Sequence, residues 1–379
     1  MRKGKNPVTI RYWDYSGEYE KDRARIIAAV DKVFSSGRLI LGRSVADFES
    51  HFAQYCGSRF GVGVNSGTDA LFLALKALGI GQGDEVITVA NTAVPTVAAI
   101  RAAGATPVFI DVEEDTFLID ATLLGAALTK RTRCILPVHL FGQPADMDAI
   151  LKIAEQDQIP VIEDCAQAAG ATFKGRRAGS FGDVGAFSFY PTKVLGGYGD
   201  GGMVITDKER LRAKLRRLRF YGMDEAYYSE EEGFNSRLDE VQAAILDFKL
   251  PKLDDDVRER QRIAEQYTDG LAGVGDITPP SVRPGRTHQF YAYTVRTKDR
   301  DGLRRHLLEH GIETKINYPA PIHLMRGYSF LAYSPGDLPV TERLAGQILS
   351  LPLYPGLPEE AVARIVVSVK NYFRTPKTR

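Results

Sequence analysis

One lysine of this chain stands where it could act as a nucleophile. Lys193 lies in the segment SFYPTKVLGGYGDGG, residues 188–202, after an apolar run and within a glycine-rich loop. An ordinary lysine is almost entirely protonated at neutral pH, so it attacks carbonyl carbons poorly. Burial disfavours an ammonium, and a neutral amine at a strand end can be captured by an aldehyde. The placement suits a Schiff-base lysine, although most lysines are merely solvated and glycine-rich turns are common.

A second segment could bind an anion. In NSGTDALFLALKALG the residues Asn65, Ser66, Gly67 and Thr68 come directly before an amphipathic helical pattern. Free N–H groups and the positive dipole end at the start of a helix attract a phosphate. The simpler alternative is that Ser66 or Thr68 only caps the helix.

A third segment, IPVIEDCAQAAGA, places Asp164 at the end of an expected strand and Gln167 three residues later. A carboxylate against a pyridine nitrogen keeps that nitrogen protonated, which lets the ring accept electrons from a carbanion. Alone, such an aspartate is more often a cap or an ion-pair partner. An amine for an aldehyde, a phosphate site and an acid for a ring nitrogen together describe one ligand, pyridoxal phosphate.

The elements that must position these residues alternate between residues 60 and 206. Short β-branched runs indicate strands, and amphipathic segments between several of them indicate helices. This alternation predicts an α/β fold with a mainly parallel sheet covered by helices on both faces. Ligands bind at the carboxyl ends of such strands, so we expect Asp164, Ser188 and Lys193 on a common rim. The expected strands are FGVGV, EVITVA, PVFIDV, CILPV, IPVIED, VGAFSFY and GGMVIT; the expected helices are ALFLALKAL, PTVAAIRAA, ATLLGAALTK and ADMDAILKIAEQ.

The length of 379 residues predicts two packed domains. After Asp207 the pattern becomes helical and charged, and residues 237–273 indicate one long helix bent near Pro251. A strand in HQFYAYTVRT, a helix in DGLRRHLLEHG and a short strand in IETKI are expected to follow. We therefore expect a large cofactor-binding domain over residues 1–250 and a smaller α/β domain over residues 251–379.

Composition excludes several classes of function. Basic and acidic residues number 49 and 48, so the net charge of +1 favours neither nucleic acid nor an anionic membrane as a partner. The three cysteines show no CxxC spacing and the six histidines are scattered, which argues against a disulfide scaffold or a metal site. The first fifteen residues lack the apolar core of a signal peptide, and no apolar run is long enough to span a membrane. We expect a cytoplasmic protein.

Over nearly its whole length the chain resembles the DegT/StrS-type sugar aminotransferases, which are fold-type-I pyridoxal-phosphate enzymes that install amino groups on nucleotide-linked ketosugars. The resemblance implies a large domain with a mainly parallel sheet, a smaller C-terminal α/β domain, and a homodimer with shared active sites. It is carried by the segments SSGRLILGRSVADFE, NSGTDAL, GDEVIT, PVHLFGQPADMD, EDCAQAAGA, FSFYPTK, FNSRLDEVQAA and YPAPIH.

The resemblance also implies roles for single residues. Lys193 would form the Schiff base and act as the base in proton transfer, Asp164 would pair the pyridine nitrogen, and Gln167 would lie beside the ring oxygen. The implied phosphate-binding residues are Gly67, Thr68, Ser188 and, from the neighbouring subunit, Asn235. The residues implied to approach the nucleotide-sugar are Tyr318 and His323.

Two departures from the family pattern bear on the substrate. Many relatives have an aromatic residue that stacks on the cofactor ring where this chain has Ala93, and relatives that aminate C-3 often have asparagine where this chain has Val194. The remaining loop is more similar to the C-3 group than to the C-4 group. The resemblance therefore implies amino transfer from glutamate to C-3 of a dTDP-linked 3-keto-6-deoxyhexose, with C-4 amination as the alternative.

Two other activities compete with this interpretation. A pyridoxal-phosphate sugar dehydratase of the same family is disfavoured because those relatives have histidine in place of Lys193. A catalytically silent binding or regulatory protein could keep the same fold, because fold alone does not fix activity. The presence of Lys193, Asp164 and Asn235 argues for an enzyme.

Overall fold

The computed structural model describes residues 9–224 and 227–374. The outer ends of both predicted domains, residues 1–8 and 375–379, therefore lie outside the described residues. Its helices are α1 (Tyr15–Ser36), α2 (Arg43–Cys56), α3 (Gly67–Ala77), α4 (Val94–Ala102), α5 (Leu124–Ala127), α6 (Met147–Gln156), α7 (Glu209–Leu218), α8 (Glu240–Lys249), α9 (Leu253–Leu271), α10 (Arg300–Glu309), α11 (Pro339–Ala345) and α12 (Glu359–Arg374). Its strands are β1 (Phe60–Val64), β2 (Glu85–Val89), β3 (Thr106–Ile110), β4 (Thr132–Ile135), β5 (Ile162–Asp164), β6 (Thr172–Phe173), β7 (Arg176–Arg177), β8 (Val184–Ser188), β9 (Gly202–Thr206), β10 (Tyr293–Arg296) and β11 (Ile348–Leu351).

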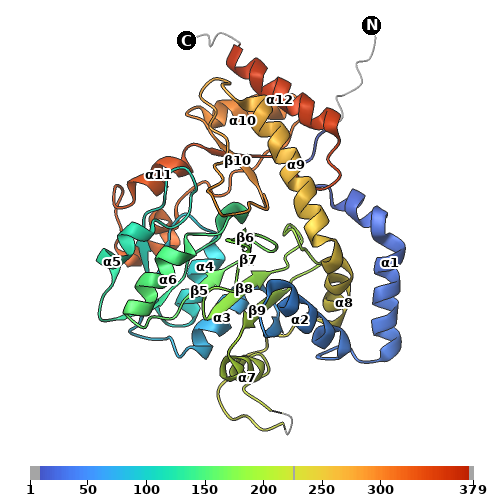
Figure 1. Ribbon diagram of the computed structural model, residues 1–379, viewed down its shortest axis with the longest axis vertical. Helices are drawn as coiled ribbons and strands as arrows, with labels where there is room; N and C mark the ends of the chain where they lie inside the picture. The colour runs from blue at the N-terminus through green and yellow to red at the C-terminus, as the bar shows by residue number, and fades with distance from the viewer. Residues whose placement is uncertain (1–8, 225–226, 375–379) are drawn as a thin grey trace.

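A mixed sheet runs through the larger part of the molecule (Figure 1). Strands β1, β9, β8 and β5 are neighbours in that order, and β3, β2 and β4 are neighbours in theirs. Parallel bridges from Ile135 to Val161 and from Val138 to Asp164 join the two groups. The pairs β2–β3, β2–β4 and β5–β8 are parallel, whereas β9 runs antiparallel to β1 and β8. The mainly parallel sheet expected from the sequence is confirmed, with β9 as its antiparallel member.

Helices cover both faces of this sheet because successive side chains of each strand point to opposite faces. Ala186 and Val204 belong to one core with residues of α3, α4, α6 and α7. Their neighbours Phe187 and Met203 belong to a second core with residues of α2 and α8. Because these strands are buried on both faces, their sequences are continuous apolar runs and do not alternate between apolar and polar residues.

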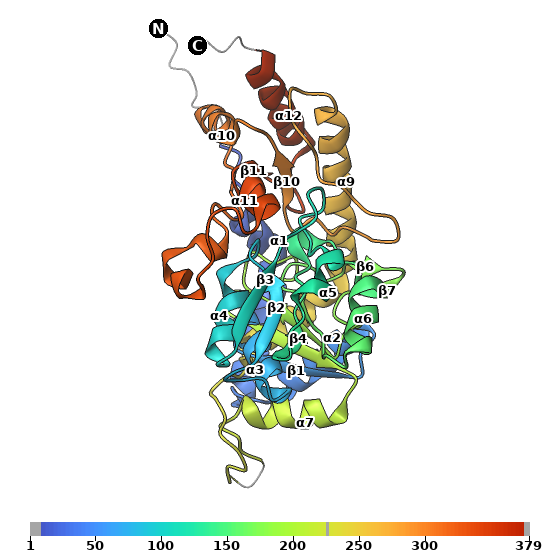
Figure 2. The same cartoon turned by 90° about the vertical axis from the view of Figure 1, so that its left-hand side faces the viewer.

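The long helical run bends where the sequence predicts it. Residues Leu250–Lys252 form a single 3-10 turn that contains Pro251 and separates α8 from α9, because proline lacks the N–H that a continuous helix needs. Helix α9 then runs from α8 to the C-terminal lobe, which contains α10, α12, β10 and β11 (Figure 1). Figure 2 shows α10 and α12 at the end of the molecule opposite α7. A third core there contains residues of α9, α10, α12, β10 and β11. The boundary between residues 250 and 251 stays a prediction.

Two predicted elements differ from the structure. IETKI forms no strand, because Ile312 bridges Ile10 whereas Lys315 bridges Ser350, so its residues pair with two different segments. ATLLGAALTK contains only a 3-10 turn and the four-residue helix α5. Among the described residues, no helix is long and apolar enough to cross a membrane.

Candidate active site

A cavity of about 480 Å³ opens at the carboxyl ends of β5 and β8. It brings together Asp164, Ser188 and Lys193, which confirms the common rim expected from the sequence. Its lining residues come from segments far apart in the chain: Tyr15, Ser66, Gly67, Thr68, Leu71, Thr92, Ala93, Pro95, Thr96, Val138, Asp164, Ala166, Gln167, Ser188, Tyr190, Thr192, Lys193, Asp200, Tyr291, Lys315, Asn317 and Tyr318.

Lys193 lies in a tight turn that follows β8. Its backbone N–H donates to the carbonyl oxygen of Tyr190 over 2.8 Å. A Cβ atom at Gly196 would lie 2.5 Å from the carbonyl oxygen of Pro191, so the loop closes this tightly only with glycine there. Val194, next in the chain, is only 8% exposed and belongs to the core beneath the sheet. The buried side chain of Val194 anchors the loop, and the neighbouring Lys193 lines the cavity.

The first turn of α3 lines the cavity next to Ser188. Ser66 is the N-cap, and its hydroxyl accepts a hydrogen bond from the N–H of Asp69 over 3.1 Å. The helix begins at Gly67, so Gly67 and Thr68 belong to its first turn, where the sequence had suggested a preceding loop. A Cβ atom at Gly67 would come within 2.5 Å of the Cβ atom of Ser188. Only glycine lets the helix end approach Ser188 this closely. The unpaired N–H groups in the first turn of α3 and the hydroxyl of Ser188 together suit a phosphate.

Asp164 is a buried carboxylate with hydrogen-bond donors on both oxygens. Oδ2 accepts from the hydroxyl of Thr96 over 2.8 Å, and Oδ1 accepts from the N–H of Ala166 over 3.1 Å. Burial raises the pKa of Asp164 above its usual value, while these two donors and the charge of Lys193 oppose that rise. A cation placed against this carboxylate would be strongly stabilised, which fits a protonated pyridine nitrogen.

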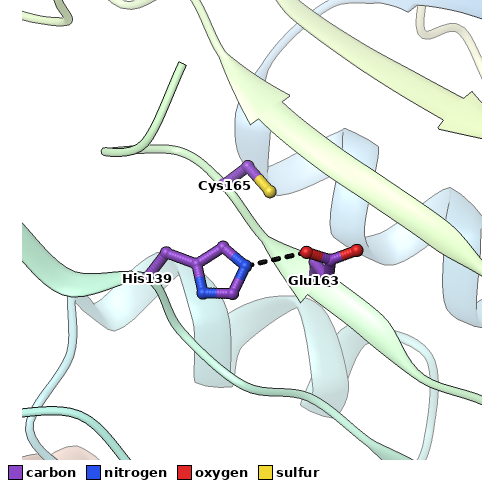
Figure 3. Close-up of side chains that lie close together, drawn as sticks. All are labelled: His139, Glu163 and Cys165. Carbon is purple, nitrogen blue, oxygen red and sulfur yellow. Dashed lines mark hydrogen bonds and ion pairs between the residues drawn. The ribbon is translucent and has the colours of Figure 1, made fainter. Parts of the chain in front are cut away.

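His139, Glu163 and Cys165 lie together (Figure 3), with their possible ligand atoms within 4.8 Å of one another, and the last two flank Asp164 in the chain. The Nδ1 atom of His139 accepts from the N–H of Ala145 over 3.1 Å, so its Nε2–H donates to Glu163 over 2.9 Å. Glu163 also accepts from the N–H groups of residues 179, 181 and 182, and burial raises the pKa of Cys165 well above its usual value. The histidine and the carboxylate are already engaged and the thiol is protonated, so this cluster anchors the end of β5 and supplies no open metal site.

Gln167 is fixed by hydrogen bonds at both ends of its amide. Oε1 accepts from the N–H of Phe141 over 2.7 Å, and Nε2 donates to the phenol oxygen of Tyr318 over 3.0 Å. Burial raises the pKa of Tyr318, so its phenol stays protonated. The contact between Gln167 and Tyr318 ties the wall formed by the C-terminal lobe to the carboxyl end of β5.

Two of the residues implied by the resemblance lie outside this cavity. Asn235 is exposed and forms an antiparallel bridge with Phe220. His323 is 2% exposed, and its Nε2 atom lies 3.1 Å from Oε1 of Glu342. The expected roles of Asn235 toward a second subunit and of His323 toward a nucleotide-sugar stay predictions.

Several cavity residues have no assigned role at this site in the predictions from sequence. Thr96 stands in a predicted amphipathic helix, where a hydroxyl one turn after a start at the sheet rim is a usable signal. Tyr291 and Lys315 stand in predicted strands, and Tyr15 and Asn317 stand in segments that carry no local motif. Ala93 lines the cavity, and its methyl group cannot stack on a ring.

The residues present fit pyridoxal phosphate. The close approach of Gly67 and Ser188 provides a phosphate cradle, Asp164 is a buried carboxylate with its oxygens fixed by donors, and the lysine lines the same cavity. These three features are far apart in the sequence and converge on one cavity. Their convergence is visible only in the three-dimensional structure.

Comparisons with known proteins identify the family. The profile of the DegT/DnrJ/EryC1/StrS aminotransferase family matches residues 20–370. The dTDP-3-amino-3,4,6-trideoxy-alpha-D-glucose transaminase of Micromonospora megalomicea subsp. nigra is 50% identical over 369 residues, covering 96% of this chain and 99% of that protein. The crystal structure of S. venezuelae DesV in complex with a ketimine intermediate has a TM-score of 0.95 at 45% identity, covering 97% of this chain and 99% of that one.

A more distant structure shows the cofactor. That of ntda from Bacillus subtilis, with bound cofactor PMP, has a TM-score of 0.90 at 29% identity and covers 99% of this chain and 87% of that one. PMP is the amine form of pyridoxal phosphate, the cofactor expected here. The chain belongs to the DegT/DnrJ/EryC1/StrS aminotransferase family and is a pyridoxal-phosphate-dependent aminotransferase with the fold-type-I architecture.

Proposed function

We propose that this enzyme transfers an amino group from L-glutamate to C-3 of a dTDP-linked 3-keto-6-deoxyhexose. The observation that carries the proposal is the convergence of Lys193, Asp164 and the start of α3 on one cavity. The 50% identical relative is named for a dTDP-3-amino sugar, which supports both the nucleotide and the position of amination.

Each residue has a defined task in the proposed reaction. The start of α3 and Ser188 bind the phosphate, and Asp164 holds a proton on the pyridine nitrogen. When bound, pyridoxal phosphate supplies an aldehyde that captures amines and a ring that delocalises an electron pair. Lys193 is displaced by the amino donor, and its free amine then moves the proton between the substrate carbon and C4′ of the cofactor.

The side of the cavity that faces the C-terminal lobe is available for the sugar. Asn317 and Tyr318 line it, and Ala93 leaves space that an aromatic residue would fill. Amination at C-4 remains the alternative in the same family.

The proposal includes a homodimer in the cytoplasm. An exposed Asn235 is available to a second subunit, whose phosphate site it would complete. The three cysteines of the chain are free and buried, which suits a reducing compartment.

The deciding experiment offers the amine form of the enzyme a panel of nucleotide-linked ketosugars and identifies products by mass spectrometry. We expect L-glutamate to generate the amine form, and a dTDP-linked 3-keto-6-deoxyhexose to consume it. Amination of the 4-keto isomer without amination of the 3-keto isomer would overturn the regiochemistry and leave the aminotransferase assignment intact.

A further inference from the structure

The side chain of Lys193 lies against an aromatic ring. Its Nζ atom is 4.7 Å from the ring centroid of Tyr291, within the range of a cation–π contact. Among the described residues, the lysines that form ion pairs include Lys174, Lys208 and Lys249, and Lys193 is not one of them. The ring is therefore in direct contact with the ammonium group, which also feels the charge of the buried Asp164 carboxylate.

Tyr291 is itself held in place. Its ring packs against the cores on both faces of the sheet, and its phenol oxygen lies 3.3 Å from the hydroxyl oxygen of Thr192. The residue thus contacts both Lys193 and the residue before it. A ring fixed in this way can define where a flexible lysine side chain rests, because it offers one attractive surface to a group with many rotamers.

Resting on the proposed function, we propose that Tyr291 is a positioning residue for the proton transfer by Lys193. The neutral amine takes a proton from the α-carbon of the amino donor, the electron pair of the broken C–H bond passes into the cofactor ring, and the lysine becomes an ammonium. The face of Tyr291 stabilises this ammonium until the same proton is delivered to C4′ of the cofactor. The ring attracts the ammonium and not the neutral amine, so it acts on the state that carries the proton.

The charged groups that face the lysine do not replace this role. The carboxylate of Asp164 is engaged by Thr96 and Ala166 and is expected to pair the pyridine nitrogen. Asp200 also lines the cavity but forms no ion pair with Lys193, and Lys315, which lines it too, is itself a cation. Stabilisation of the ammonium by the ring leaves the carboxylate free for the cofactor.

The test compares Tyr291→Phe with Tyr291→Leu, and then varies the electron density of the ring without changing its shape. Phenylalanine, 4-fluorophenylalanine and pentafluorophenylalanine are incorporated at position 291, since fluorination weakens a cation–π contact. The measured quantity is the rate constant of the glutamate half-reaction at its high-pH plateau, with α-deuterated glutamate used to confirm that proton transfer limits the rate. Affinity for PMP and the thermal midpoint of each variant report separately on binding and folding.

We expect Tyr291→Phe to stay within about twofold of the wild type and Tyr291→Leu to be about threefold to tenfold slower, the range that a partly exposed cation–π contact supports. The rate should fall steadily with fluorination, while PMP affinity stays within twofold. A rate independent of fluorination, an equal loss in Tyr291→Phe and Tyr291→Leu, or a loss that follows PMP affinity would overturn the proposal.

A second readout follows the lysine directly. In the PMP-bound protein with 13C-labelled lysine, the ε-methylene signal assigned by its loss in Lys193→Ala should be shifted upfield by the ring of Tyr291 and should return to its ordinary position in Tyr291→Leu. An unshifted signal in the wild type would overturn the proposal even if Tyr291→Leu does not fold. Failure of the wild type to bind PMP would instead contradict the proposed function itself.

Discussion

The hydroxyl of Thr96 donates a hydrogen bond of 2.8 Å to Oδ2 of Asp164. The hydroxyl of Thr92 lies 2.9 Å from that of Thr96, and since Thr96 uses its proton on the carboxylate, Thr92 donates to Thr96. This relay favours the charged form of a carboxylate whose pKa burial raises. The charge of Asp164 is therefore maintained by residues of α4 and the turn before it.

Thr96→Val should shift the pH dependence of the enzyme. Loss of a donor to the charged carboxylate raises the pKa of Asp164 further, so activity that needs the ionised carboxylate should fall at a higher pH on the acid side. We expect the acid limb of the kcat/KM profile to move to higher pH, with a loss of about threefold to tenfold at pH values on that limb. Thr96→Ser keeps the hydroxyl and is the matched control; an identical profile in Thr96→Val would contradict the relay.

Asp164→Asn should retain the cofactor and lose amino transfer. The phosphate cradle and Lys193 are unchanged, but a neutral amide cannot keep the ring nitrogen protonated. We expect both half-reactions to slow by at least about 100-fold, as for other electrostatic contacts to developing charge. Asp200→Asn, the other carboxylate that lines the cavity, should stay within about threefold; comparable losses in both variants would argue against a specific electron-sink role.

Lys193→Ala should bind the cofactor without covalent attachment. Lys193 and Lys315 are the lysines that line the cavity among the described residues, so Lys315→Ala is the matched control. After borohydride reduction, peptide mapping of the wild type and of Lys315→Ala should locate the label on Lys193, and Lys193→Ala should carry none. Label on any other lysine would refute the assignment.

Cofactor binding should strengthen the dimer if Asn235 completes the phosphate site of the neighbouring subunit. A ligand that binds only the dimer stabilises it by mass action. In sedimentation of serial dilutions, pyridoxal phosphate should lower the dimer dissociation constant of the wild type by about tenfold or more, and Asn235→Ala should lose most of that effect. Asn317→Ala, which alters the cavity of the same chain, should keep it, and a wild-type dissociation constant indifferent to cofactor would rule out a shared site.

The sequence by itself determined the parts of this protein that are local. Strand and helix periodicities between residues 60 and 206 follow from which side chains are buried, so each predicted strand there overlaps an observed one. The start of α3, the end of β5 and the loop carrying Lys193 each have a motif within a few residues, and their order along the chain carried the family resemblance. The bend at Pro251 was also predictable, because proline alone removes a helical hydrogen bond.

Only the tertiary structure decided which distant residues serve those motifs. Thr96 meets Asp164 across 68 positions of sequence, and Gln167 meets Tyr318 across 151. Tyr291 reaches Lys193 from the segment before β10, and His323 pairs with Glu342 outside the cavity where the resemblance suggested a contact with substrate. Such contacts depend on how helices pack on the sheet and how the C-terminal lobe folds back over its rim, and packing of that kind leaves no periodic trace in the sequence.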